Sequence, residues 1–454
     1  MQKAFGPINI VEIMNENYRL RKFGADKIAL LVLFVLALLI AQIIIKTRSK
    51  LELSEPIELS NTGLSLSIPL GNGWESDEKW HYDENTFSLG SYLFIGATEP
   101  SAYVFCRYLL APEMISPEIW FARKAAGVQG AVEEISRIQK ENLNIDWARI
   151  ECPDTLLSIF LGTVELPHNR RFNIEVNQMT LEMGLAQKVF EQVIESLIVR
   201  DNPKLDTGRD IIAKIKNDGL DGFLVNRDKK NNFMIMNSRK QNIGFALEVL
   251  IDSDSGDDFN IQAASHFYLT GLNNREKGAF YRGENNIEEF AWQSQILGTT
   301  EKAYTKTVLD EDGIITVVKY SNLEAGEERY KFGPTMIPEI FIEPILSRML
   351  QDDIKEIVID VIDSEGDIIP IYISSIEAEA ENNNEEYVFR IDFMGEQDVF
   401  ERVYLDRKKQ ISRIILQQNQ RYIFESTSLE NIAEAFPERA DIILTRDEKL
   451  KSIF

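Results

Sequence analysis

The sequence RIILQQNQRYIFESTSLENIAEAFP, residues 413–437, holds two strand-like segments and one short helix pattern. Residues 411–417 and 421–426 are rich in Ile, Tyr and Phe, which predicts two strands separated by a polar turn. Residues 429–436 predict a short helix, and Pro437 ends it because proline cannot continue a helix. We expect these elements to complete a large antiparallel sheet.

Strand-like segments recur at regular intervals before this stretch, with Asp-, Asn- and Gly-rich turns between them. Regular spacing of this kind is typical of a meandering antiparallel sheet. The predicted strands are 221–227, 232–237, 243–252, 259–269, 277–283, 287–296, 303–310, 314–322, 356–361, 368–378, 386–393 and 398–406.

Two helices are predicted in the same part of the chain. Residues 207–217 form the first, after a polar linker at 200–206. Residues 336–350 form the second, with Pro338 in its first turn and a kink at Pro344. The sheet is therefore expected to curve, with helices crossing one face.

The region before residue 200 has a different order of elements. Strands are predicted at 64–68, 87–95, 102–110, 145–151, 156–164 and 171–177. Ser116-Pro117-Glu118 predicts a helix start, with Ser as the N-cap and Pro at the first helical position. Its apolar side would comprise Trp120, Val128, Val132, Ile135 and Ile138. A closing helix at 180–198 presents one apolar face at four-residue steps.

An uncharged apolar run, IALLVLFVLALLIAQIII at residues 28–45, precedes both regions. Eighteen residues at about 1.5 Å rise per residue nearly match the thickness of a bilayer, so we expect a single transmembrane helix that acts as an uncleaved anchor. Residues 1–27 carry five Lys or Arg and residues 46–50 carry three. This bias favours a cytoplasmic N-terminal arm, a linker at 46–57 and exported domains at 58–200 and 207–454, in a bacterial inner membrane. The reverse orientation stays open.

The net charge of the chain is −24, and its first fifty residues carry net +5, so the remainder carries −29. A domain this acidic repels polyanions, which argues against nucleic acid as a partner. We expect no cofactor and no metal, because there is no Cys-x-x-Cys and the three His residues are scattered. The Asp-rich segment 252–258 lacks the Gly and Glu positions of an EF-hand loop.

Two motifs in the first region, SLSIPLGNGW (65–74) and VFEQVIESL (189–197), carry a resemblance to the PsbP-like fold. This resemblance covers 58–200 and implies an antiparallel α/β/α sandwich. PsbP-like proteins are small non-enzymatic binding and assembly modules, so the resemblance also implies a partner-binding role.

The second region resembles the LolA and LppX half-barrels of the periplasm over 207–445. The matching features are QNIGFALEVL (241–250), the helix after the first set of strands, VIDSEGDIIPIYISSI (361–376) and the closing stretch 413–437. Proteins of this architecture hold acyl chains or similar apolar ligands in the concave face. A chain anchored by a helix could not shuttle such a ligand freely.

Four aromatic side chains are the candidate lining of an apolar pocket: Phe267, Phe280, Phe290 and Trp292. Alternate side chains of a strand point to opposite faces, so only some of them would line the concave face. The alternative is an ordinary core under the crossing helix. Cys106 and Cys152 could form one disulfide in an exported domain, or could be buried thiols.

The sequence thus predicts a membrane-anchored α+β protein with an antiparallel sandwich and a larger curved antiparallel sheet. We expect a binding or assembly module for a protein partner in the envelope, and not an enzyme. The alternative is binding of a lipid or another apolar ligand. A hydrolase is the least favoured function, because no nucleophile, phosphate-loop or metalloprotease motif is present.

Overall fold

The computed structural model describes most of the chain from residue 52 to residue 445. The described residues are Leu36 and 52–59, 61–70, 74–77, 88–96, 103–110, 116–140, 143–168, 170–179, 183–219, 229–252, 261–270, 275–284, 286–296, 303–321, 325–376, 387–394, 399–418 and 420–445. The predicted arm at 1–27, the predicted strand at 221–227 and, apart from Leu36, the predicted anchor at 28–45 lie outside these ranges.

The first sheet has seven antiparallel strands in the order β5-β6-β7-β11-β10-β9-β8. Its long strands pair over seven to ten residues, with ten between β10 and β11. The strands are β5 (Trp74–Asp77), β6 (Ser88–Gly96), β7 (Tyr103–Leu110), β8 (Ala131–Lys140), β9 (Leu143–Cys152), β10 (Leu157–Leu166) and β11 (Arg170–Met179). Short strands beside it form two small sheets: β1 (Glu52–Leu53) with β4 (Pro69–Leu70), and β12 (Ile198–Val199) with β3 (Leu64–Leu66) and β2 (Ile57–Leu59).

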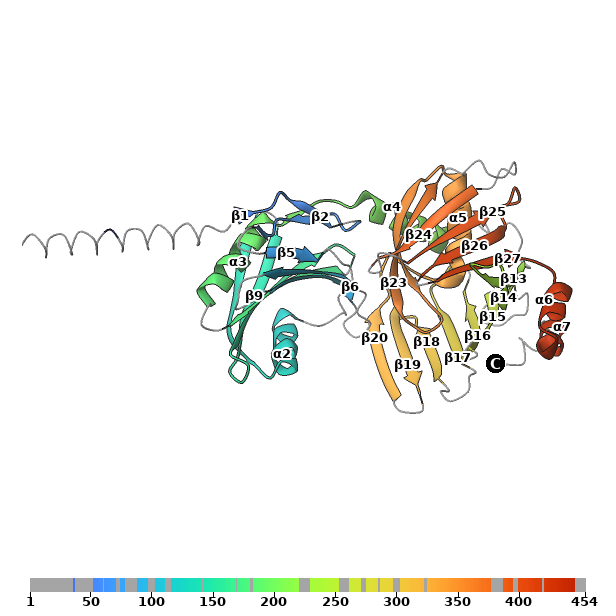
Figure 1. The fold of residues 1–454 in the computed structure, drawn as a ribbon, viewed down its shortest axis with the longest axis horizontal. Coiled ribbons are helices and arrows are strands. Elements are labelled where there is room, and N and C mark those ends of the chain that lie inside the picture. The colour runs from blue at the N-terminus through green and yellow to red at the C-terminus, as the bar shows by residue number, and fades with distance from the viewer. Residues whose placement is uncertain are drawn as a thin grey trace, which may run out of the picture.

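Helices pack on both faces of the first sheet (Figure 1). Helix α2 (Pro117–Gly127) covers one face, where Phe121 packs with Ile150. Helix α3 (Met183–Ser196) covers the other face, where Phe190 stacks near Phe160 with ring centroids 5.8 Å apart. The expected sandwich of helix, antiparallel sheet and helix is therefore present.

Helix α2 ends earlier than the sequence pattern predicts. Ser116 accepts a hydrogen bond from the Ile119 amide at its start, as expected. The chain then reverses at Gln129, whose φ is 54°, and residues 131–140 form the edge strand β8. The helical assignment of Val132, Ile135 and Ile138 was wrong because the three lie on a strand, where β-branched side chains are equally at home.

Helix α4 (Pro203–Asp218) connects the two sheets, and it begins in the segment predicted as a linker. Asn202 caps it by accepting a hydrogen bond from the Leu205 amide, and Pro203 occupies the first turn. Helix α4 packs against β22 (Glu356–Ile362) so closely that a Cβ at Gly208 would lie 2.2 Å from the Val358 carbonyl oxygen. The linker prediction was wrong because Asn-Pro is also a strong helix start.

The second sheet has fifteen strands, antiparallel except for one pair, in the order β20 to β13 followed by β27 to β21. The first group is β13 (Lys229–Asn237), β14 (Asn242–Asp252), β15 (Ile261–Leu269), β16 (Arg275–Gly283), β17 (Phe290–Ile296), β18 (Ala303–Leu309), β19 (Ile314–Tyr320) and β20 (Ala325–Lys331). The second group is β21 (Met336–Pro338), β22, β23 (Ile368–Ile376), β24 (Tyr387–Phe393), β25 (Phe400–Leu405), β26 (Ile411–Gln417) and β27 (Arg421–Ser426).

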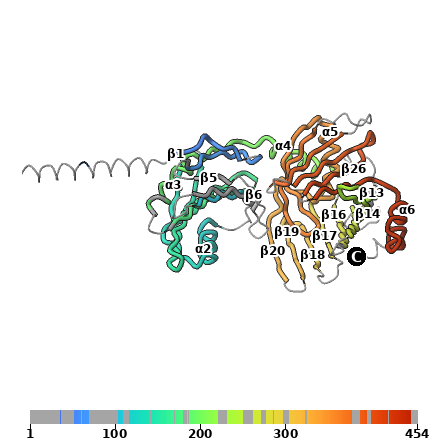
Figure 2. The backbone as a smooth tube through the Cα atoms, viewed as in Figure 1, coloured from blue at the N-terminus to red at the C-terminus, as the bar shows by residue number. Residues whose placement is uncertain are grey.

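The closing strand β27 pairs with β13, so the last strand of the chain joins the two groups. The two edges of the sheet, β20 and β21, follow each other in the chain, and the sheet curves strongly between them (Figure 2). Two short elements differ from the sequence prediction. Strand β20 occupies residues for which no strand was predicted, and β21 pairs in parallel with β22 where a helix start was expected.

Three helices complete this region. Helix α5 (Ile342–Gln351) follows the short turn η4 (Glu339–Phe341) and packs inside the curve of the sheet. It starts six residues later than predicted, so Pro344 lies in its first turn and causes no kink, because the first-turn amides need no helical partner. Helices α6 (Leu429–Ala435) and α7 (Ala440–Leu444) pack on the outer side of β13–β15, where Phe436 contacts Phe245.

Within the described ranges, no helix is both long and apolar enough to cross a membrane. The fold is α+β, with a large antiparallel sheet and few helices.

Candidate functional site

A cavity of about 510 Å³ lies between α5 and the concave face of the second sheet. Its wall comes from β13–β17 on one side and from β24–β27 on the other, with η4 and α5 across it. A volume of this size is typical of small-molecule sites. The position is the concave face that the sequence predicts as a binding surface.

Apolar side chains form much of the wall. They include Ile340, Leu346, Ile391, Val403, Ile414 and Phe424. Two of the four aromatic residues predicted from the sequence, Phe267 and Trp292, also line the cavity. Tyr281, which was not among the four, lines it as well.

The other two predicted residues do not line the cavity. Phe290 is fully buried and stacks on Tyr281 in the adjacent core, with ring centroids 5.7 Å apart. Phe280 alternates with Ala279 and Tyr281 on β16, which places it on the opposite face. The sequence identified the right strands, but it could not fix which residues of each strand face inward.

Four carboxylates line the cavity from four different elements, and sequence reasoning missed all of them. Glu343 lies on α5. Glu248 lies on β14, Glu339 on η4 and Glu401 on β25. Asn231 donates a hydrogen bond to Glu248 Oε2 over 3.3 Å. Each acid interrupts an apolar stretch, as in ALEVL around Glu248 and IPEIF around Glu339. An acid on the inward face of an apolar strand was the signal that could have found them.

The enclosure of the cavity changes the acidity of these carboxylates. Burial raises the pKa of Glu339 to about 7, and the negative charges of Glu401 and Glu248 add to this effect. Burial also raises the pKa of Glu401 to about 7, again with Glu248 contributing. The Glu339 side chain is open to the cavity but surrounded by protein, so it is accessible and still poorly solvated.

Three lysines line the cavity, Lys277, Lys408 and Lys409, and their charges partly offset those of the carboxylates. Lys277 on β16 donates a hydrogen bond to Glu365 Oε1 over 2.7 Å, and its charge lowers the pKa of Glu339. Glu365 belongs to the turn between β22 and β23, whose Gly366 carbonyl accepts a hydrogen bond from the Tyr330 hydroxyl. Ser364 of the same turn lines the cavity.

Cys106 and Cys152 are both buried free thiols, so the disulfide considered from the sequence is not formed. They lie on opposite faces of the first sheet, Cys106 in the core under α3 and Cys152 in the core under α2. Two strands separate β7 from β9, which puts the thiols beyond the reach of a disulfide. In the part of the chain that the structure describes, no cluster of three or more His, Cys, Asp or Glu could hold a metal ion.

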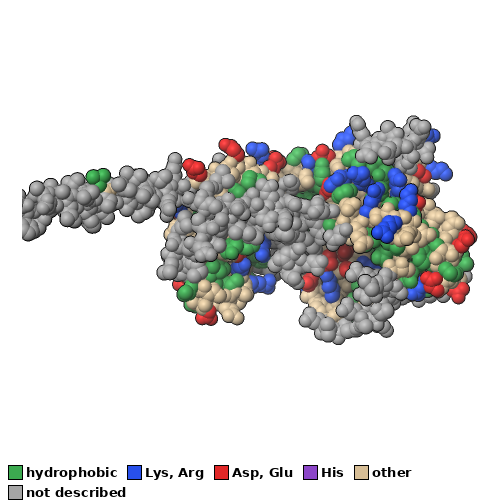
Figure 3. Space-filling view, viewed as in Figure 1, with side chains coloured by type: hydrophobic (Ala, Val, Ile, Leu, Met, Phe, Trp, Pro, Cys, Tyr) green, Lys and Arg blue, Asp and Glu red, His purple; other side chains and the backbone are tan. Residues whose placement is uncertain are grey.

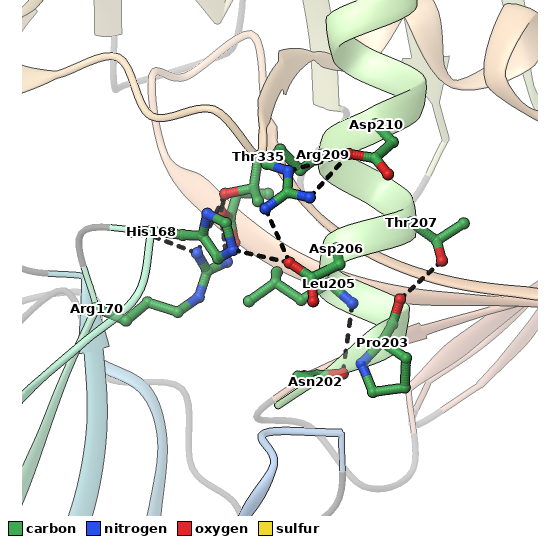
Figure 4. Close-up of polar contacts among 11 residues, drawn as sticks. His168, Arg170, Asn202, Pro203, Leu205, Asp206, Thr207, Arg209, Asp210 and Thr335 are labelled. Atoms are coloured by element: carbon green, nitrogen blue, oxygen red, sulfur yellow. Dashed lines mark hydrogen bonds and ion pairs between the residues drawn. The ribbon is translucent and has the colours of Figure 1, made fainter. Parts of the chain in front are cut away.

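A buried ion pair joins the first sheet to the second. Arg170 on β11 donates hydrogen bonds to both carboxylate oxygens of Asp360 on β22, at 2.7 and 2.5 Å. Thr335 contacts both partners, and the side chains of the pair are 1% and 0% exposed. Nearby, His168 and Arg209 both contact Asp206 on α4 (Figure 4). The junction is therefore fixed by polar contacts of precise geometry.

No protein-family model and no curated protein matches the chain. Two of the solved structures that are similar to it follow. A β-barrel-like protein from Brucella abortus, with the domain of unknown function DUF1849, is 8% identical, covers 44% of this chain and 95% of its own, and has a TM-score of 0.35. Cyanobacterial PsbP (CyanoP) from Synechocystis is 8% identical, covers 32% of this chain and 92% of its own, and has a TM-score of 0.27. A PsbP-family structure is thus among the similar ones, and the LolA and LppX resemblance stays a prediction.

Proposed function

We propose that the protein is a binding module, and that its cavity between α5 and the second sheet holds an apolar molecule that carries a basic group. The observation that carries this proposal is the cavity of about 510 Å³ with apolar walls. Apolar burial supplies affinity, and a few placed polar groups supply selectivity.

The basic group follows from the carboxylates. The charges of Glu248 and Glu401 help to raise the pKa of Glu339, and the charge of Glu248 helps to raise the pKa of Glu401. A bound cation would remove this repulsion. An anionic ligand such as a fatty acid would add a further negative charge to this group. The ligand class is therefore an apolar amine or a similar cation, in preference to an acid.

In this proposal the protein is held at the membrane by the anchor predicted at residues 28–45, and its main role is binding and not catalysis. An anchored module in the envelope would hold such a ligand near a bilayer, where apolar amines partition. The predicted orientation and the bacterial inner membrane belong to the same proposal.

Matched ligands test the proposal on the full-length protein. Dodecylamine and dodecanoate share one tail and differ in head-group charge, so calorimetric titration at pH 8 separates tail from charge. We expect dodecylamine to bind at least about tenfold more tightly, which corresponds to about 1.4 kcal/mol. Equal affinities for the two ligands would show that the carboxylates do not select the head group. If neither ligand binds, the proposed function is wrong.

A cavity-filling variant locates the binding. Ser265 lies on β15 and lines the cavity, so Ser265→Trp should reduce the affinity for dodecylamine. Gln293 lies on the opposite face of β17 from Trp292, so Gln293→Trp is the matched control and should bind normally. If both variants bind dodecylamine like the wild type, the ligand lies elsewhere.

A further inference from the structure

The outer face of the second sheet carries a group of arginines that the cavity does not use. On β24, β25 and β26, side chains that alternate with the cavity-lining ones point outward. They include Arg390, Arg402 and Arg413, and Figure 3 shows basic side chains gathered over these strands. We call the outer face of β24–β27 the arginine window.

The described helices leave the arginine window between them. Helix α4 packs on β22, and Arg170 of the first sheet reaches Asp360 on the same strand. On the other side, α6 and α7 pack over β13–β15. The arginines of the window are half-buried, and Ile415 beneath them is 6% exposed.

The local charge is opposite to that of the whole chain. Described residues 387–394 and 399–426 hold seven Lys or Arg and four Asp or Glu, whereas the chain carries −24. Glu401, Lys408 and Lys409 line the cavity, which leaves five Arg against three Asp or Glu. The window is thus a basic area on an acidic protein.

Aromatic rings hold the guanidinium groups in place. The Arg390 guanidinium lies 4.0 Å from the centroid of Phe400, and that of Arg413 lies 3.9 Å from the centroid of Tyr404. The Arg402 guanidinium lies 5.7 Å from the same Phe400 ring. Stacked guanidiniums are preorganised for carboxylate oxygens because less rotamer freedom is lost on binding.

Arg402 has the clearest unmet bonding capacity. It lies directly opposite Arg390 across the β24–β25 ladder, an arrangement of like charges that costs stability. Arg390 pairs with Asp392 at 2.6 Å. Among the residues that the structure describes, Arg402 forms no ion pair, and its buried Nε has no hydrogen-bond partner.

We propose that the arginine window binds a short, extended, acidic segment of a partner protein. Arg390 and Arg402 are cross-strand neighbours about 5 Å apart at Cβ, and Arg402 and Arg413 are diagonal neighbours at about 7 Å. Acidic side chains at alternate positions of an extended peptide are about 7 Å apart, which matches the spacing of Arg402 and Arg413.

The size of the window favours a short segment over an extended polyanion. Two acids lie on the window itself, Asp392 beside Arg390 and Glu425 opposite Arg413. Further exposed acids border it, with Glu356 on one side and Glu430 and Glu434 of α6 on the other. At physiological salt, charges interact over about 8 Å, so a short segment that lies along Arg390, Arg402 and Arg413 interacts mainly with these side chains. A bilayer surface or a nucleic acid would also meet the bordering acids.

Fluorescence anisotropy on the full-length protein tests the proposal. The probe is a fluorescein-labelled peptide of alternating Glu and Ser with four Glu, and the control peptide has Gln in place of Glu. We expect saturable binding of the Glu peptide alone, weakened at least tenfold by Arg402→Gln and weakened by added salt. Arg329→Gln on the edge strand β20 changes the same charge at an exposed site and should leave binding unchanged.

Three results would overturn the proposal. They are absence of saturable binding up to about 1 mM peptide, equal binding of the Glu and Gln peptides, and equal weakening by Arg402→Gln and Arg329→Gln. A parallel titration with phosphatidylglycerol vesicles and a single-stranded oligonucleotide completes the test. If either binds through Arg402 while the peptide does not, the partner is a polyanion and the assignment to a protein segment is wrong.

Discussion

The outer face of the second sheet has two neighbouring regions in which arginine side chains differ in burial and in pairing. At β22, Arg170 from the first sheet is buried, and its two terminal nitrogens donate hydrogen bonds to Asp360 and Thr335. At β24–β26, Arg390, Arg402 and Arg413 stand half-buried, and Arg402 has no carboxylate partner among the described residues. The first region is a completed interface within the chain, and the second has the chemistry of an interface still to be completed.

The comparison shows that the surroundings of an arginine decide its role. A buried charge must be paired, because an unpaired one costs several kcal/mol. A half-buried charge can stay unpaired at little cost, which leaves it available for a partner. The same sheet can therefore use one strand for internal docking and adjacent strands for recognition.

The largest effect on stability is expected when the buried Arg170–Asp360 ion pair is broken. Asp360→Asn leaves the Arg170 charge buried without a counter-charge, so we expect the free energy of unfolding to fall by about 3–5 kcal/mol. Asp392→Asn removes the partner of Arg390, which is 33% exposed, and should cost no more than about 1 kcal/mol. Urea denaturation of both variants measures the difference.

A double variant separates pairing from packing at the same place. Arg170→Met with Asp360→Leu removes both charges, so it should recover most of the stability that Asp360→Asn loses. If Asp360→Asn and Asp392→Asn cost the same, the junction at β22 is not the tightly packed interface described above.

A second test concerns how closely α4 lies on β22. Gly-to-Ala in a helix usually stabilises by up to about 1 kcal/mol. At Gly208 the added Cβ would meet the Val358 carbonyl at 2.2 Å, so Gly208→Ala should instead destabilise by about 1–3 kcal/mol. Gly184→Ala in α3, with no atom within 4 Å of the new Cβ, is the control and should be neutral or stabilising. Thermal unfolding gives the sign of the stability change for both variants. If both variants are stabilised, α4 does not lie as close to β22 as described.

These contacts show what the sequence could and could not predict. The strands of the second sheet and the closing helix follow from local patterns such as residues 413–437. The pairing of β27 with β13, and of Arg170 with Asp360, joins residues about 190 positions apart, and no local pattern encodes them. The concave site was placed on the correct strands, but Phe280 and Phe290 were assigned wrongly because a one-residue shift in phase moves every side chain to the other face.

The third test uses pH to sharpen the contrast between the two faces of β25, where Glu401 points into the cavity and Arg402 points out. The folded-state pKa values of Glu339 and Glu401, about 7, exceed the ordinary value of 4.5. The folded state therefore binds protons more tightly, and the stability from these groups is present below pH 4.5 and is lost as pH rises through 7. We expect the stabilisation from each group to fall by on the order of 1 kcal/mol over this range, after allowance for solvent screening.

Glu401→Gln isolates this contribution. The variant should show a smaller fall in the free energy of unfolding between pH 5 and pH 8 than the wild type. Glu327→Gln on the edge strand β20, an exposed acid, should leave the pH dependence unchanged. Identical pH profiles for the wild type and Glu401→Gln would mean that Glu401 is well solvated and that the cavity is more open than the structure indicates.

The smallest expected effect concerns the arginine window, and its sign distinguishes function from structure. Arg402 faces Arg390 across the ladder, and Thr is a good strand former, so Arg402→Thr should raise the free energy of unfolding by about 0.5 kcal/mol. A residue kept for stability would show a loss when replaced, whereas a residue kept for binding can show a gain. Urea denaturation of Arg402→Thr beside Arg329→Thr on β20 measures this difference. A clear loss of stability at Arg402 would mean that its stacking on Phe400 supports the sheet, which would remove the reason to regard the like-charge pair as a feature maintained for a partner.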